Sequence, residues 1–129
     1  VLVTGAQWNV PALLLGCVCG VWAALVLLCN ECADRETDRV AHKRTLAVRV
    51  PPRPLALLIG AVVALAIVAT VYTRVPCVLV PVLLQAVAGT VIAVLIWHGT
   101  RRAVRAATRT GMLAFALVTI TLAGCLLGW

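Results

Sequence analysis

The sequence predicts an all-α fold, a polytopic membrane bundle of about four transmembrane helices in a single domain. The chain has 129 residues, of which 64% are hydrophobic, and its mean hydropathy is +1.11. Only 12% of the residues are charged, whereas soluble domains average about 25%. The apolar residues form four long blocks, each near the roughly 20 residues that a helix needs to cross the hydrocarbon core.

Each of the four blocks should be a helix, because a backbone in lipid must satisfy its own hydrogen bonds. The expected spans lie near residues 10–29, 55–73, 75–97 and 112–128. Three prolines, Pro51, Pro52 and Pro54, separate the second span from the polar segment before it. Gln85, in the third span, is a functional candidate because it is strongly polar and deep in the membrane. We favour a simpler interpretation, an interhelical hydrogen bond.

The basic residues predict how the chain is oriented. Ten of the eleven lie in two connections, residues 30–54 and 98–111, and Arg74 lies between the second and third spans. With four spans, both connections lie on the same side of the membrane. The positive-inside rule makes that side the cytoplasm, at the cell inner membrane. The net charge of +7 therefore indicates orientation in lipid and gives no reason to expect nucleic acid as a partner.

The cysteines include one pair with suggestive spacing. Cys29 and Cys32 match a redox or zinc half-site. A zinc site needs about four ligands, and the sequence has no second CxxC and no HxxxH pair. Because buried free cysteine behaves as a small hydrophobe, we interpret the cysteines as structural or incidental.

All four acidic residues lie in one polar segment, residues 29–49, which reads CNECADRETDRVAHKRTLAVR. If the first helix continues into it, Asn30, Asp34 and Asp38 recur every four residues and share one face. Glu36 then points elsewhere. Acids at a helix C-terminus oppose the macrodipole, and like charges four residues apart repel each other. A positive charge should therefore compensate them.

Two kinds of compensation are open on this pattern. Arg35, Arg39 and Lys43 are placed to pair with the acids, which would give a solvated charged face, as mixed charge runs usually do. Alternatively, the carboxylates hold a hard divalent cation. Mg²⁺ favours one or two carboxylates plus phosphate oxygens, and lysine and arginine then serve as further phosphate ligands.

Twelve residues of the polar segment match a known motif in one unbroken register. They are Asn30, Glu31, Asp34, Glu36, Asp38, Arg39, Lys43, Arg44, Thr45, Leu46, Val48 and Arg49. The run resembles the second aspartate-rich motif of the UbiA superfamily of membrane prenyltransferases. It is most similar to the branch that includes 1,4-dihydroxy-2-naphthoate polyprenyltransferase, where the segment lies at the cytoplasmic end of a transmembrane helix.

The segment departs from the family pattern at three positions. Ala33 replaces a proline, Pro51 replaces a glycine, and His42 replaces the glycine before the lysine. The last change matters if that position requires a positive φ, which glycine adopts most readily. These departures concern the conformation of the connection rather than the acidic ligands.

The resemblance also implies that half of the enzyme is missing. Family members are about twice as long, with around nine helices in two pseudo-repeated halves. Their first half carries another motif, NDxxDxxxD, and this chain has no acids left to form one. The chain also opens VLVTGAQWNV, without an initiating Met or a basic signal region. We expect residues 1–129 to be the C-terminal half of such a domain, inactive without its N-terminal half.

The resemblance implies Mg²⁺-dependent transfer of a polyprenyl group from its diphosphate to an aromatic acceptor, in menaquinone-type quinone biosynthesis. It implies that Asp34 and Asp38 bind Mg²⁺ and, with Lys43, act in catalysis. The residues implied to bind the diphosphate are Asn30, Arg39, Lys43 and Arg44. The alternative hypothesis is a non-enzymatic four-helix membrane subunit, or a transporter half, whose charged connection is only solvated.

Overall fold

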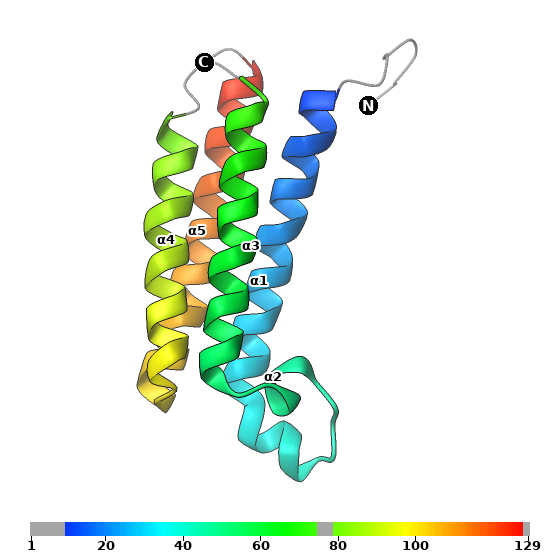
Figure 1. The fold of residues 1–129 in the computed structure, drawn as a ribbon, viewed down its shortest axis with the longest axis vertical. Coiled ribbons are helices and arrows are strands. Elements are labelled where there is room, and N and C mark those ends of the chain that lie inside the picture. Colours follow the sequence, from blue (N-terminus) through cyan, green and yellow to red (C-terminus); the bar gives the residue numbers. More distant parts are fainter. Residues whose placement is uncertain (1–9, 75–78, 128–129) are drawn as a thin grey trace.

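The computed structural model describes residues 10–74 and 79–127 of the chain, and within these ranges the regular structure is all helical. The helices are α1 (Val10–Val40), α2 (Leu46–Arg49), α3 (Pro52–Tyr72), α4 (Leu79–His98) and α5 (Arg101–Leu127). All except the short α2 are long and apolar enough to cross a membrane. The predicted all-α membrane bundle is confirmed (Figure 1).

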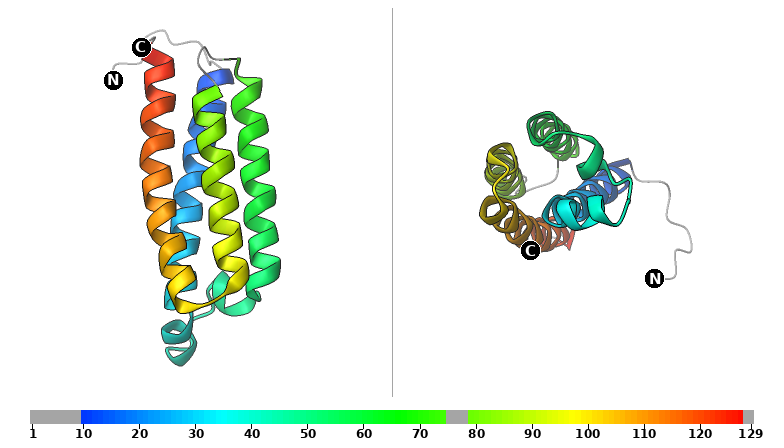
Figure 2. Two further views of the ribbon diagram at one scale, coloured as in Figure 1. Left: turned by 90° about the vertical axis from the view of Figure 1, so that its left-hand side faces the viewer. Right: turned by 90° about the horizontal axis from the view of Figure 1, so that it is seen from below.

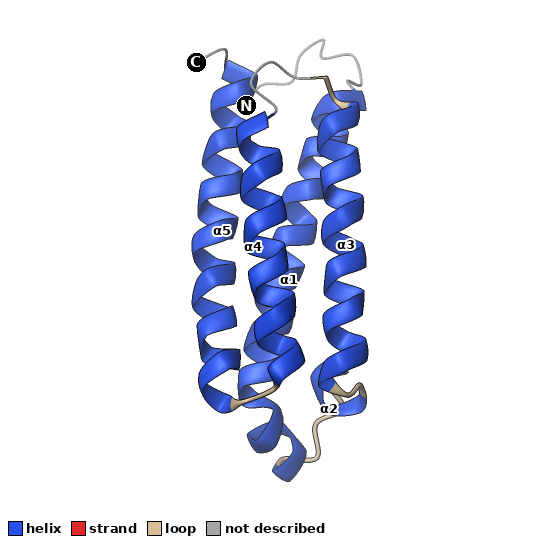
Figure 3. Ribbon diagram, turned by 60° about the vertical axis from the view of Figure 1, so that its left-hand side comes forward, coloured by secondary structure: helices blue, strands red, loops and turns tan. Residues whose placement is uncertain are grey.

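The four long helices stand side by side, and α2 lies beside the end of the bundle where α1 finishes (Figures 1 and 3). Seen along the bundle, α1 neighbours α5, α5 neighbours α4, and α4 neighbours α3 (Figure 2). The α1–α3 pair is the least tightly associated of the neighbouring long helices, and α2 also contacts α1. The bundle is therefore most open between α1 and α3.

Two predicted boundaries were wrong because polar residues were assigned to connections. The first helix does not end near residue 29 but continues to Val40, since no proline or glycine interrupts residues 21–50. The last long helix begins at Arg101, not near residue 112. Its start is marked by Thr100, whose hydroxyl accepts a hydrogen bond from the Ala103 N–H at 3.2 Å, as an N-cap residue does.

The second and third spans agree more closely with prediction. Helix α3 begins at Pro52, so two of the three prolines lie within its first turn, where their missing N–H groups have no helical partner to lose. Helix α4 begins at Leu79, and the first predicted residues of that span, 75–78, lie outside the described ranges.

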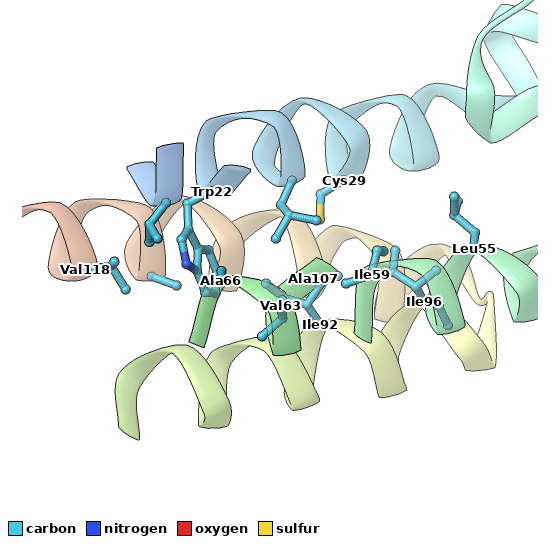
Figure 4. Packing of buried hydrophobic residues seen from close by; sticks show 14 of the residues in the cluster. Trp22, Cys29, Leu55, Ile59, Val63, Ala66, Ile92, Ile96, Ala107 and Val118 are labelled. Atoms are coloured by element: carbon cyan, nitrogen blue, oxygen red, sulfur yellow. The ribbon is translucent and has the colours of Figure 1, made fainter. Parts of the chain in front are cut away.

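The core consists of apolar side chains that all four long helices contribute. Trp22 and Cys29 of α1 point inward toward α3 and α5, as Figure 4 shows, and both are fully buried. Helices α3 and α4 approach most closely at Gly89, where an added Cβ would overlap the Val63 side chain. Such close approach through small residues is how helices associate in lipid, where burial of apolar surface gives little driving force.

Gln85 forms the interhelical hydrogen bond that the sequence favoured. Its Nε2 donates to Thr70 Oγ1 at 3.0 Å, joining α4 to α3, and both side chains are fully buried. Thr70 in turn donates to the Ala66 carbonyl oxygen at 2.8 Å. The amide is therefore part of the packing between two helices.

Candidate functional site at the basic end of the bundle

One end of the bundle carries nearly all of the charge. We call it the basic end: α1 and α4 finish there, and α3 and α5 begin there (Figure 1). Ten of the eleven basic residues belong to it, and Arg74 follows α3 at the opposite end. All four acids lie in the last turns of α1, between Glu31 and Asp38. Acidic and basic residues therefore lie close together only around the end of α1.

Helix α1 ends in a Schellman motif that folds the chain back on itself. The N–H of His42 donates to the Arg39 carbonyl oxygen at 3.2 Å, and the N–H of Lys43 donates to that of Asp38 at 2.9 Å. His42 has φ +54, the left-handed conformation that this position requires and that glycine usually supplies. The requirement for a positive φ at residue 42 is thus confirmed.

This reversal of the chain brings the side chain of Lys43 next to Asp38, the last acid of α1. Lys43 Nζ lies 2.9 Å from Asp38 Oδ1, and the Asp38 side chain is only 7% exposed, against 63% for Lys43. The hydrogen bond to Asp38, and then the charge of Asp38, raise the pKa of Lys43. The lysine is therefore a cation throughout the neutral range, and it provides the positive charge that the acids at the helix end require.

The other predicted site residues differ in exposure. Asn30, Asp34 and Asp38 do share one face of a continuous helix, with Asn30 half-buried, Asp34 exposed and Asp38 buried. Glu36 lies off that face and pairs with Arg39 at 3.7 Å, on side chains that are both more than half exposed. An exposed pair of this kind contributes little to stability.

The carboxylates of α1 suit a shared metal site rather than a complete one. Within the described ranges, no group of three or more His, Cys, Asp and Glu residues is placed to hold a metal ion. Asp34 and Asp38 are one turn apart on one face, and two carboxylates are the share that a protein commonly gives to Mg²⁺ bound with phosphate. Their chemistry fits that ion, provided that the remaining ligands come from elsewhere.

Glu31 has a role that the sequence did not reveal. A carboxylate oxygen of Glu31 accepts a hydrogen bond from the Ala47 N–H at 3.5 Å, near the start of α2. The two residues are sixteen positions apart, so neither periodicity nor motif spacing signals the contact. It ties the end of α1 to the connection that leads into α3.

Glu31 also lies at one end of an apolar groove between α1 and α3. The groove has a volume of about 320 Å³, and Glu31 is its only charged lining residue. Its other walls come from α1, α2 and α3: Val21, Ala24, Leu25, Leu27, Leu28, Leu46, Leu58, Ile59 and Val62. The sequence could not reveal this groove, because its walls come from three separate elements.

The groove and the carboxylates are continuous along α1. Leu27, Glu31, Asp34 and Asp38 follow the spacing i, i+4, i+7, i+11, which places them on one stripe of the helix. Leu27 and Glu31 line the groove, and the two aspartates follow toward the helix end. We call the three acids among them, Glu31, Asp34 and Asp38, the carboxylate stripe.

Of the described cysteines, Cys29 has the buried, structural position that we expected, and Cys17 is exposed. Cys29 is buried in the core, and its carbonyl oxygen accepts a hydrogen bond from Thr108 of α5 at 3.1 Å. Cys17, Cys19, Cys29 and Cys32 are free thiols. Cys77 and the side chain of Cys125 lie outside the described residues.

Comparison with protein-family models, curated proteins and solved structures found no match to this chain. The features that bear on its function are therefore those of the chain itself: the carboxylate stripe, the lysine that folds back onto it, and the groove that leads into the bundle.

Proposed function

We propose that this chain is the C-terminal half of a Mg²⁺-dependent membrane prenyltransferase of the UbiA type. The complete enzyme would transfer a polyprenyl group from its diphosphate to an aromatic acceptor, in quinone biosynthesis. One observation carries the proposal: the carboxylate stripe joins an exposed acid, Asp34, and a buried one, Asp38, to an apolar groove of about 320 Å³. A polyprenyl diphosphate has the same two parts, a charged head and an apolar chain.

Each residue has a defined part in this proposal. Asp34 and Asp38 would hold Mg²⁺, which when bound supplies positive charge to the diphosphate oxygens. Lys43, held 2.9 Å from Asp38, would offset the negative charge that develops on the leaving diphosphate as the C–O bond breaks. Asn30, Arg39 and Arg44 belong to the same end of the molecule and would bind the diphosphate.

The groove would serve the other half of the substrate. Its walls are apolar from Val21 to Leu28 along α1, and Leu46 of α2 contributes at the basic end. An apolar wall holds a prenyl chain and keeps water away from the carbocation that forms at its first carbon. The Glu31–Ala47 hydrogen bond would keep α2 in position over that wall.

The positive-inside rule supports a cytoplasmic location for the basic end, in an inner membrane. The diphosphate would then enter from the cytoplasm. The missing N-terminal half of the enzyme would add the second acidic motif and the remaining metal ligands, so we expect no prenyl transfer by these 129 residues alone.

A specific observation favours a second candidate, a non-enzymatic membrane subunit or transporter half. The acids already have partners within the helix end, in the Asp38–Lys43 and Glu36–Arg39 pairs. Such pairs alone would make the polar segment a solvated charged surface with no ligand.

The two candidates differ in what Asp34 does. In a longer polypeptide that adds an NDxxDxxxD half to this chain, Asp34→Asn should abolish Mg²⁺-dependent prenyl transfer, measured with a radiolabelled polyprenyl diphosphate. Glu36→Gln is the matched control, because it removes the same charge from the neighbouring face of the helix. Equal activity of the Asp34→Asn and Glu36→Gln enzymes would reject the site.

A further inference from the structure

A second groove lies on the outer face of α3 and α4, away from the carboxylate stripe. It consists of two adjoining cavities of about 550 and 310 Å³ that share Gly60, Ala93 and Val94. Small residues form much of its floor, and the Trp97 ring stands at the basic end. No residue of α1 lines it, so it is separate from the proposed prenyl groove.

The length of this groove matches one leaflet of a bilayer. Its lining on α3 runs from Ala56 to Ile67, a distance of about 17 Å at 1.5 Å per residue. This is about half of the roughly 30 Å hydrocarbon core. Farther from the basic end the helices carry large exposed side chains, among them Val68 and Leu83. A spanning helix would need a longer groove, whereas a lipid acyl chain fits this one.

The mouth of the groove is positively charged. The guanidinium of Arg53 lies 5.6 Å from the centre of the Trp97 ring, within the range of a cation–π contact. Arg53 makes no ion pair in the part of the chain that the structure describes. No acidic residue occurs on α3, α4 or α5, and Arg101 and Arg102 begin α5 directly beyond the end of α4. The charge at this mouth is therefore uncompensated by its own helices.

From the length of the groove and the charge at its mouth, we propose that it binds an anionic glycerophospholipid of the leaflet at the basic end. One acyl chain lies along Gly60 and Ala93, and the phosphate lies against Arg53. Basic pockets between transmembrane helices recognise anionic headgroups in this way. The proposal uses no residue of the diphosphate site, so it does not depend on the proposed function.

Filling the groove tests the acyl-chain part of the proposal. Nothing lies within 4 Å of a Cβ built at Gly60, so the Cβ of Gly60→Leu meets no neighbouring atom and its side chain enters the groove. Native mass spectrometry of the purified chain with dioleoylphosphatidylglycerol should show one retained lipid, which Gly60→Leu loses. Gly16→Leu is the matched control, because a Cβ at Gly16 on α1 is equally unobstructed. Ala61→Leu, also at the groove, serves if Gly60→Leu does not fold by circular dichroism.

Removing the charge tests the headgroup part. Arg53→Gln should lower the retention of phosphatidylglycerol about fivefold, the effect of one basic residue near an anionic headgroup, and should leave the weak retention of dioleoylphosphatidylcholine unchanged. Arg105→Gln removes the same charge from the same end of the bundle, on α5 rather than beside the Trp97 ring as Arg53 is, and should have little effect.

Three results would overturn the proposal. Equal retention of the two lipids by the wild-type chain would exclude recognition of the anionic headgroup. Retention by Gly60→Leu equal to that of Gly16→Leu would exclude the groove. A wild-type dimer that Gly60→Leu converts to a monomer would show that a second copy of the chain occupies this face.

Discussion

The last turns of α1 and the first turns of α5 lie at the same end of the bundle. Both carry charges that are unfavourable at their helix end, but these charges are compensated differently. Residues 31–38 place four acids near a helix C-terminus, and residues 101–109 place four arginines near a helix N-terminus. Both sets of charges oppose the macrodipole. At α1, Lys43 folds back to compensate the acids. At α5 the described residues provide only the Thr100 cap, and the arginines stay exposed.

The difference shows where charge remains uncompensated at this end of the bundle. The acids of α1 are partly compensated by their own chain, which leaves one exposed carboxylate, Asp34, beside a buried and paired one, Asp38. The arginines of α5 have no acid on their own helix or on the two helices beside the outer groove. The charge that the chain itself leaves uncompensated is therefore negative at Asp34 and positive at the start of α5.

Proline substitutions test the premise of this comparison, that both segments are helical, and should have the largest effects. Thr37→Pro in α1 and Ala106→Pro in α5 should each destabilise the fold by about 3 kcal/mol, since an interior proline removes a helical hydrogen bond and clashes with the preceding turn. Unfolding in mixed micelles, followed by circular dichroism, measures this. Arg101→Pro is the control, because the first helical position tolerates proline. If Ala106→Pro is as stable as the wild type, residues 101–111 are not helical and form a loop instead.

Removing the cap of α5 should have the next largest effect. Thr100→Ala loses the hydrogen bond from Ala103 and should cost about 1 kcal/mol. Thr100→Asp keeps a capping acceptor and adds a negative charge where the macrodipole favours one, so it should match or exceed the wild type in the same unfolding assay. If both variants are less stable than the wild type by the same amount, the side chain does not act as a cap.

The C-terminus of α1 should respond in the opposite direction. His42 holds φ +54 without being glycine, so His42→Gly should stabilise the chain by up to about 1 kcal/mol. His42→Ala keeps the strain and should bring no such gain. A loss of stability in His42→Gly would show that the imidazole makes a contribution larger than the backbone strain.

The Asp38–Lys43 pair should have the smallest effect on stability. Lys43 has a raised pKa in the folded chain, so its contribution is complete below the ordinary lysine pKa and is lost as pH rises through the raised value. Stability should therefore differ little between the wild type and Lys43→Gln at strongly alkaline pH and most near neutrality. A difference that grows with pH would contradict the pairing.

Much of the fold could be predicted, because long apolar blocks indicate membrane-spanning helices directly and the prolines at residues 51–54 mark the start of α3. The four-residue recurrence of Asn30, Asp34 and Asp38 gives these residues a shared face only if α1 continues past Cys29, whereas hydropathy alone ends the span there. The early start of α5 was missed, since arginine-rich turns look like a connection when only hydropathy is weighed. The sequence could not predict the hydrogen bond between Glu31 and Ala47 or either groove, because both depend on which helices become neighbours.

The measurement that bears most directly on the proposed site is metal binding at the carboxylate stripe. Mn²⁺, used in place of Mg²⁺ as a paramagnetic probe, can be titrated into the purified chain with and without farnesyl diphosphate and followed by electron paramagnetic resonance. We predict that Mn²⁺ binds only when the diphosphate is present, that Asp34→Asn abolishes the binding, and that Glu36→Gln retains it. Binding that is the same in Asp34→Asn and in the wild type, or that ignores the diphosphate, would contradict the site.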